Sequence, residues 1–183
     1  IMISTLLAQV FVYTYSNFYN IKLYNENDPL LKTKILYNLY NLCLGIILPL
    51  VYIKDSMYTE YASFLTEVWN VFMYAMCMEY LFYMVHYYMH HNKIVYKTIH
   101  YVHHTEREPN VIDAYYLHPF EAISIIGVLW TPLFFLQISQ ISLMLLQTVY
   151  LIVTILEHGG LKNNQIHMRH HFHYNCNFCA IIP

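Results

Sequence analysis

The sequence predicts an all-α integral membrane protein, a helical bundle with a cytosolic histidine-rich helical cap. Three observations support this fold class. Apolar residues make up 58% of the 183 residues and charged residues 11%, whereas a soluble domain has roughly 45–50% and about 25%. Several apolar runs are as long as a membrane-spanning helix. All 12 histidines lie between residues 86 and 173, many of them at helical spacing.

The apolar runs predict where the chain crosses the membrane. A helix needs roughly 20 mostly apolar residues to cross about 30 Å of hydrocarbon. Three segments meet this requirement: residues 1–17, 35–53 and 62–86. The third carries Glu67, Asn70 and Glu79, which we expect to face the interior of the bundle because polar groups are costly in lipid. The alternative, a soluble helical protein with these runs as its core, would have to bury an unusually large apolar fraction.

A fourth apolar region has a different pattern. Residues 122–156 contain no charged side chain, but Pro132 and the Gln-Ile-Ser-Gln stretch at 137–140 interrupt them. Proline removes a helical hydrogen bond and breaks or kinks a helix. The pattern therefore predicts a helical hairpin of two short arms, which either cross the membrane fully or dip in and return.

The cationic residues predict the orientation. With three spans before residue 121, segments 18–34, 87–121 and 157–183 lie on one face of the membrane. That face carries eight cationic residues: Lys22, Lys32, Lys34, Lys93, Lys97, Arg107, Lys162 and Arg169. The opposite face keeps only Lys54. Because cytoplasmic loops carry an excess of Lys and Arg, we expect the face that holds residues 87–121 to be cytosolic.

Composition also excludes some classes of protein. The net charge of −2 leaves no basic footprint for nucleic acid. With 4 Gly and 6 Pro there is little room for a disordered linker, so we expect one domain over residues 1–183. Cys176 and Cys179 form a single CxxC, for which we expect no metal role because a second pair is missing.

The histidines fall into clusters whose spacing indicates metal binding. The clusters are His86, His90 and His91, then His100, His103 and His104, then His167, His170 and His171, with His118, His158 and His173 standing apart. Residues three and four apart lie on one helix face, so each cluster can aim at least two imidazoles at one point. Imidazole suits Zn, Cu, Fe and Ni, so ligand type alone does not select the metal. The HExxH motif of zinc proteases is absent.

Five motifs together carry a family resemblance. They are HYYMHH (86–91), HYVHH (100–104), YLHPFE (116–121), LEHGG (156–160) and HMRHHFHYNCNF (167–178). In this order they resemble the fatty acid hydroxylase/sterol desaturase superfamily, over about residues 62–183. The chain then divides into N-terminal spans (1–61) and a histidine-box region (62–183), and the missing closing segment of the family indicates truncation at the C-terminus.

The resemblance implies a chemistry and a set of ligands. Members of the superfamily use a non-haem di-iron centre, O2 and electrons, commonly from cytochrome b5 or its reductase, to hydroxylate or desaturate lipids. The resemblance implies two Fe ions here, with Zn as a substitute in a purified sample, and a location in the endoplasmic reticulum with the histidine boxes on the cytosolic side. The implied metal ligands are His86, His90, His100, His103, His104, His158, His167, His170 and His171.

The remaining histidines and the carboxylates have other expected roles. We expect His118 to shape the site rather than bind metal and His173 to be a bystander, while the role of His91 stays open. Carboxylates that accept the second N–H of an imidazole orient metal-binding histidines. The candidates for this task are Glu79, Glu106, Asp113, Glu121 and Glu157.

Several functional alternatives stay open at this point. The substrate is a sterol or a fatty acyl chain, and the HPFE motif with the HHFHYNCNF ending favours members that resemble sterol desaturases. The reaction is hydroxylation or desaturation. A non-catalytic relative of the family, or a membrane protein that binds or transports metal, is the alternative to an enzyme.

Overall fold

The computed structural model describes residues 13–14, 23–52, 63–159 and 166–180. Apart from residues 13 and 14, the expected span 1–17 lies outside the described residues. Four long helices form the body: α2 (Leu31–Tyr52), α3 (Phe64–His91), α5 (Pro119–Trp130) and α6 (Gln140–His158). Short helices connect or follow them: α4 (Lys93–Thr98), η1 (His100–Thr105), η2 (Val111–Tyr115), η3 (Thr131–Phe134) and α7 (Ile166–His173). The described ranges contain no strand, and the all-α prediction is confirmed.

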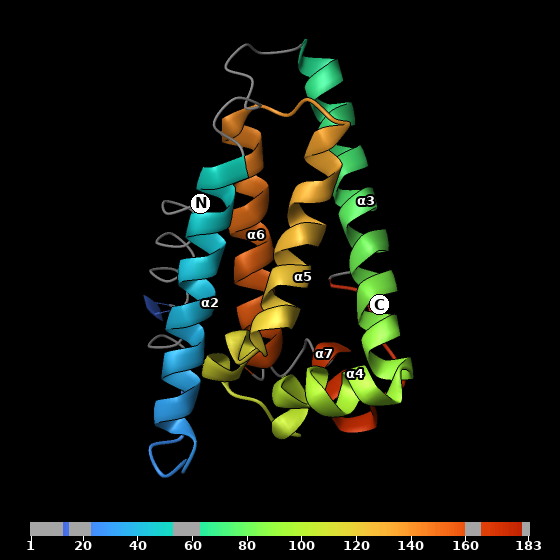
Figure 1. Ribbon diagram of the computed structural model, residues 1–183. Helices are drawn as coiled ribbons and strands as arrows, with labels where there is room; N and C mark the ends of the chain where they lie inside the picture. Colours follow the sequence, from blue (N-terminus) through green and yellow to red (C-terminus); the bar gives the residue numbers. More distant parts are fainter. Residues whose placement is uncertain (1–12, 15–22, 53–62, 160–165, 181–183) are drawn as a thin grey trace.

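The long helices form an upright bundle with the short helices gathered at one end. In Figure 1, α2, α3, α5 and α6 run roughly along the same direction, and α4 and α7 lie across their lower end. The C-terminal end of α3, the start of α5 and the end of α6 all reach this lower end. The three histidine clusters are carried by elements that meet there.

A double cap produces the sharp turn from α3 to α4. Asn92 ends α3, where its backbone N–H donates to the carbonyl of Tyr88. The Asn92 side chain also accepts hydrogen bonds from the N–H groups of Ile94 and Val95, which start α4. Asparagine is favoured as an N-cap because its side-chain oxygen satisfies the free N–H groups of the first turn. One residue therefore redirects the chain from the upright α3 toward the cluster at His100.

The hairpin predicted for residues 122–156 is confirmed. Helix α5 rises from the lower end, η3 with Pro132 at its start ends the rise, and α6 returns to the lower end. Ser139 caps α6 by accepting a hydrogen bond from the N–H of Ser142. The arms are unequal, since α5 has 12 residues and α6 has 19.

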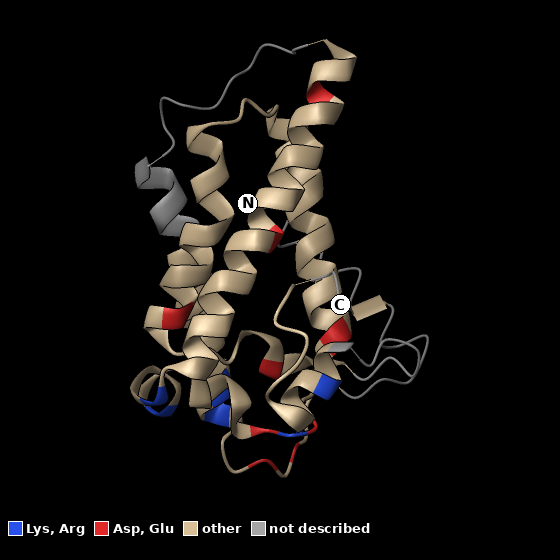
Figure 2. Cartoon of the chain, turned by 90° about the vertical axis from the view of Figure 1, so that its right-hand side faces the viewer, with Lys and Arg blue, Asp and Glu red and all other residues tan. Residues whose placement is uncertain are grey.

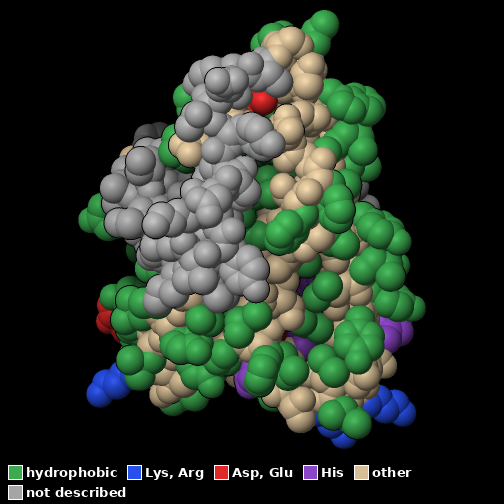
Figure 3. Space-filling view, turned by 45° about the horizontal axis from the view of Figure 1, so that its top comes forward, with side chains coloured by type: hydrophobic (Ala, Val, Ile, Leu, Met, Phe, Trp, Pro, Cys, Tyr) green, Lys and Arg blue, Asp and Glu red, His purple; other side chains and the backbone are tan. Residues whose placement is uncertain are grey.

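The surface of the bundle indicates a membrane protein. In the part of the chain that the structure describes, α3 and α6 are long and apolar enough to cross a membrane. Phe64 and Leu65 on α3 are 81% and 78% exposed, and large apolar side chains stay exposed along the helix as far as Tyr88. Apolar side chains cover much of the bundle surface in Figure 3. Large continuous apolar surface of this kind marks contact with a membrane or partner.

The described Lys and Arg residues gather at the lower end of the bundle, as Figure 2 shows. They are Lys32, Lys34, Lys93, Lys97, Arg107 and Arg169. The expected span 35–53 corresponds to α2. Lys22, Lys54 and Lys162, which also belong to the predicted charge asymmetry, lie outside the described residues. The one-ended charge distribution agrees with the expected asymmetry, and its cytosolic assignment stays a prediction.

Candidate metal centre

The structure brings the nine candidate ligands together in two groups. Histidine group A contains His86, His90, His100, His104 and His170, and histidine group B contains His103, His158, His167 and His171. Within each group, one candidate ligand atom of every residue lies within 4.8 Å of the others. Eight of the nine side chains are buried, and His90 is half-buried. The rings of His104 and His171 lie 4.6 Å apart, so the two groups adjoin.

Helical spacing explains how two groups arise from a few short segments. On α7, His167 and His171 are four residues apart and both belong to group B, while His170 points to group A. On η1, the neighbours His103 and His104 point to different groups, and the backbone leaves helical geometry at His104. Both segments therefore contribute to both groups, which holds the groups side by side.

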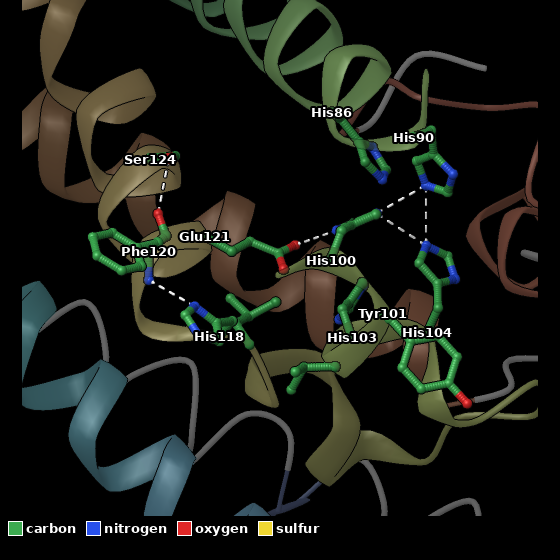
Figure 4. Close-up of polar contacts among 12 residues, drawn as sticks. His86, His90, His100, Tyr101, His103, His104, His118, Phe120, Glu121 and Ser124 are labelled. Carbon is green, nitrogen blue, oxygen red and sulfur yellow. Dashed lines mark hydrogen bonds and ion pairs between the residues drawn. The ribbon is translucent and has the colours of Figure 1, made fainter. Parts of the chain in front are cut away.

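The ring nitrogens of group A converge on one another. The Nε2 atom of His90 lies 2.8 Å from that of His100, 3.1 Å from that of His104 and 3.0 Å from that of His170. The Nε2 atom of His104 lies 3.1 Å from the Nε2 atoms of both His100 and His170. Figure 4 shows the three rings of His90, His100 and His104 turned toward a common point.

In two of these rings, a hydrogen bond at Nδ1 determines whether the Nε2 atom carries a proton or a lone pair. The Nδ1 atom of His100 donates to Oε1 of Glu121 at 2.7 Å, and the Nδ1 atom of His170 donates to the carbonyl of Cys176 at 2.6 Å. A neutral imidazole has one N–H, so the Nε2 atoms of these two rings carry lone pairs. An N–H at Nε2 of His90 or His104 can donate to only one neighbouring nitrogen, so hydrogen bonds cannot satisfy all of these Nε2 atoms at once. A cation bound between the rings would accept the lone pairs of all of them.

Backbone carbonyls orient several other rings. The Nδ1 atoms donate in three further cases: His86 to Phe178 O at 2.9 Å, His158 to Thr154 O at 2.7 Å and His171 to Glu106 O at 3.1 Å. Such hydrogen bonds select the tautomer and the orientation of a metal-binding imidazole. The Nε2 atoms are thereby left for a metal.

The turn after α7 supplies two of these carbonyls. Tyr174 and Asn177 have φ angles of 62° and 56°, in the left-handed region. Asparagine tolerates this conformation well, but a tyrosine is uncommon there. The reversal places the carbonyls of Cys176 and Phe178 against His170 and His86.

Several buried imidazole nitrogens in the described part of the chain have no hydrogen-bond partner, and this shows whether a metal ion suits the site. The buried Nε2 atoms of His86, His167 and His171 have no hydrogen-bond partner among the described residues. Leaving a buried polar atom unpaired costs free energy. Metal coordination by imidazole nitrogen removes that cost in both groups, and the all-nitrogen donor set suits Fe, Zn, Cu or Ni. The residues therefore fit two metal ions, one in each group.

Burial favours the neutral form of five imidazoles that lie outside the long helices, because it lowers their pKa. Burial, together with neighbouring imidazoles, lowers the pKa of His170 to about 4 and that of His171 to about 2. The same causes lower the pKa of His103, His104 and His167. Metal binding requires the neutral imidazole, so these side chains are ready to coordinate at neutral pH.

Three histidines lie outside both groups. His118 caps α5 by accepting a hydrogen bond from the N–H of Phe120 at 3.3 Å, so it positions the helix that carries Glu121 (Figure 4). His91 stacks on Tyr87, with ring centroids 3.7 Å apart. His173 is exposed.

The five candidate carboxylates have different contacts. Glu121 contacts His100, as expected for an orienting acid. Glu79 accepts hydrogen bonds from the Tyr150 hydroxyl and the Ala180 N–H. The carboxylates of Glu106 and Asp113 contact Lys34, and Glu157 is buried against the cavity described below.

Lys34 is a structural residue, whereas its place in the sequence predicts only a cytosolic charge. Its side chain is fully buried, and its Nζ atom lies 2.6 Å from Asp28, 3.0 Å from Glu106 and 2.7 Å from Asp113. It ties the start of α2 to the segment after η1, where the Glu106 carbonyl holds His171. In the sequence, the only indication of this structural role is that Lys34 stands at the edge of an apolar run.

A cavity of about 600 Å³ lies between α2, α3, α5 and α6 and reaches both histidine groups. His86 and His100 of group A and His103, His158 and His167 of group B are among its lining residues. Its other walls are mostly apolar and include Leu39, Leu42, Phe82, Ile125, Ile126 and Leu151. Ligand-binding sites typically enclose about 300–1,000 Å³ and have apolar walls with a few polar groups.

Comparisons with known proteins identify the family. Neither the curated proteins nor the solved structures contain a match to this chain. The fatty acid hydroxylase family matches residues 71–183, which include every histidine of groups A and B. The chain belongs to the fatty acid hydroxylase family.

Proposed function

We propose that the protein is a membrane-bound non-haem di-iron oxygenase that uses O2 and electrons to hydroxylate or desaturate a lipid. One observation carries this proposal. Nine imidazoles form two adjoining groups at the end of an apolar cavity, inside a bundle whose outer surface is suited to lipid. Family membership supports the same chemistry.

Each histidine group would hold one iron ion. When bound, iron supplies the activation of O2 that oxidation of an unactivated C–H bond requires, and the protein supplies binding and orientation. Glu121 and the backbone carbonyls of Thr154, Cys176 and Phe178 hold the rings in their tautomers. The apolar cavity walls keep water away from the reacting carbon.

The cavity favours a lipid as substrate. Its walls are mostly apolar, and it lies within the bundle next to the lipid-facing helices α3 and α6. A hydrocarbon chain or a fused-ring lipid that enters from the bilayer would stay in apolar surroundings until it reaches the imidazoles. This arrangement favours catalysis over metal transport, since the two histidine groups lie at one end of the bundle.

The partners and location follow the same proposal. The end of the bundle that carries the histidine groups and the described Lys and Arg residues faces the cytosol, in the endoplasmic reticulum. Electrons come from cytochrome b5 or its reductase, which would dock at that end.

Metal analysis combined with lipid profiling tests the proposal. The protein, purified from membranes, should contain about two iron ions per chain, and cells that express it should accumulate an oxidised lipid that incorporates label from ¹⁸O2 or gains a double bond. The His104→Ala variant removes the ring that contacts three Nε2 atoms of group A and should lose both results. Oxidised lipid at wild-type levels in cells with His104→Ala would reject the proposal.

A further inference from the structure

One face of α6 connects the metal centre with the interior of the cavity. Gln147, Leu151, Thr154 and His158 follow one another at intervals of four, three and four residues, and all four line the cavity. Residues at this spacing lie on the same face of a helix. The amide of Gln147 therefore lies on the same stripe as a histidine of group B.

Gln147 is a buried amide in the wall of this cavity. It is 7% exposed and lines the cavity together with Leu151, Thr154 and His158. Two other amides line the cavity, and both donate to backbone carbonyls: Asn38 to Ile112 O, and Asn41 to the carbonyls of Tyr115 and Leu117. Their Oδ1 atoms are buried and have no partner among the described residues. An amide in the wall of an apolar cavity can form a hydrogen bond with a polar group that a ligand brings into the cavity, so Gln147 is suited to bind such a ligand.

The distance along α6 defines the size of that ligand. Gln147 and His158 are separated by 11 residues, which corresponds to about 16 Å along the axis at 1.5 Å per residue. A ligand that contacts both ends of the stripe must have its polar group about this far from the carbon near the histidines.

The charge of the cavity limits the kind of polar group. Glu121 and Glu157 line it, and none of the described Lys and Arg residues does. A carboxylate or phosphate would therefore enter without a compensating cation and near two acidic side chains. An amide can both donate and accept a hydrogen bond, so it matches a neutral hydroxyl or carbonyl.

We propose that Gln147 is a specificity-determining residue that binds a neutral hydroxyl or carbonyl group of the lipid substrate and places the carbon about 16 Å away at the histidine groups. The inference rests on the proposed function, since it concerns the substrate of that site. Gln147 acts by positioning the lipid, and the histidines stay the residues next to the reacting carbon.

Binding of matched lipid pairs tests the inference without catalysis. The probes are hexadecan-1-ol against hexadecane, and cholesterol against its analogue without the 3-hydroxyl, each in the same detergent micelles. The wild-type protein should bind the hydroxyl-bearing member of at least one pair about three- to tenfold more tightly, as expected for one net hydrogen bond. Gln147→Leu should bind both members of that pair equally and keep the affinity for the member without a hydroxyl. Hexadecanoate should bind less tightly than hexadecan-1-ol.

A matched control variant and an analysis of the oxidised product distinguish a failure of the Gln147 inference from a failure of the oxygenase proposal. Gln140→Leu changes an exposed glutamine on the same helix and should keep the preference for the hydroxyl. In cells, Gln147→Leu should change the position at which the lipid is oxidised, while iron per chain stays at the wild-type value. Unchanged preference and position in Gln147→Leu would overturn the inference and leave the oxygenase proposal intact. Absence of iron and of lipid oxidation in the wild type would instead reject the oxygenase proposal, and the binding result would still decide the role of Gln147.

Discussion

His100 and Glu121 form a fully buried contact between the second histidine cluster and the first turn of α5. The Nδ1 atom of His100 lies 2.7 Å from Oε1 of Glu121, and their side chains are 0% and 3% exposed. The contact links residues that are 21 positions apart in the sequence. It fixes the direction in which His100 presents its Nε2 atom to group A.

Removal of this acceptor should weaken metal binding at group A. We expect Glu121→Ala to lower iron affinity or activity about 10- to 100-fold, because loss of a hydrogen bond that orients a ligand typically has this effect. Glu121→Gln should retain more of both, since its amide oxygen still accepts the Nδ1–H. Iron titration of the purified variants measures whether affinity falls from the wild type to Glu121→Gln and then to Glu121→Ala. Glu108→Gln, at an exposed position, is the control. If Glu121→Gln bound iron as weakly as Glu121→Ala, the negative charge of Glu121 would be needed and a neutral hydrogen-bond acceptor would not suffice.

Ligand substitutions in the two groups should abolish lipid oxidation. His170 belongs to group A and His103 to group B, so His170→Ala and His103→Ala each remove one imidazole from a different group. We expect at least about a 100-fold loss of product per chain, because direct ligands should matter at least as much as the residues that orient them. His173→Ala should stay close to the wild type because His173 is exposed and lies outside both groups. A wild-type rate in either of the first two variants would remove that histidine from the ligand set.

The buried cation at the base of the bundle should be needed for stability. Lys34→Met leaves three carboxylates near one another without their cation. Removal of one partner of a buried ion pair costs about 3–5 kcal/mol, and we expect about 2–3 kcal/mol because Glu106 is 37% exposed. Thermal unfolding in detergent measures the effect, and Lys32→Met, at an exposed neighbouring position, is the control. Equal melting temperatures of the two variants would contradict a structural role for Lys34.

Metal removal should destabilise the fold. The two groups place buried nitrogens without hydrogen-bond partners beside one another, and metal satisfies them. Metal bound at about 100 times its Kd stabilises a protein by about 2.7 kcal/mol, which corresponds to a fall in Tm of roughly 5–10 °C on chelation for a chain of this size. Addition of Fe²⁺ should restore the Tm. A chelator that leaves the melting curve of the iron-loaded protein unchanged would argue against metal at these groups.

The histidine-bearing end should face the cytosol. Lys97 is exposed on α4 at this end, and the asymmetry of cationic residues predicts its side of the membrane. A Lys97→Cys variant without the native cysteines should react with an impermeant thiol reagent from the cytosolic side of microsomes. Labelling after full permeabilisation provides the reference for reactivity. Reaction only after the lumen becomes accessible would reverse the orientation.

Local patterns in the sequence were sufficient to predict the hairpin helices and the candidate metal ligands. The apolar run at 122–156 with Pro132 predicted the hairpin of α5 and α6, because proline interrupts a helix wherever it stands. The HxxHH spacing at 100–104 and 167–171 predicted histidines that converge, because residues three and four apart share a helix face. The same spacing could not show that His103 and His104 join different groups, since that division depends on the kink at His104 and on the elements packed around it.

The sequence by itself determined an all-α chain with an apolar bundle and nine histidines suited to binding metal. Only the tertiary structure decided which groups surround them. The carbonyls of Phe178, Cys176 and Glu106 hold three of the rings, and every residue has a carbonyl, so no side chain marks these positions. Lys34 meets Glu106 and Asp113 across 72 and 79 residues, and the amide of Gln147 lies in the wall of a cavity formed by four helices. These contacts depend on how distant helices pack, which local spacing along the chain does not encode.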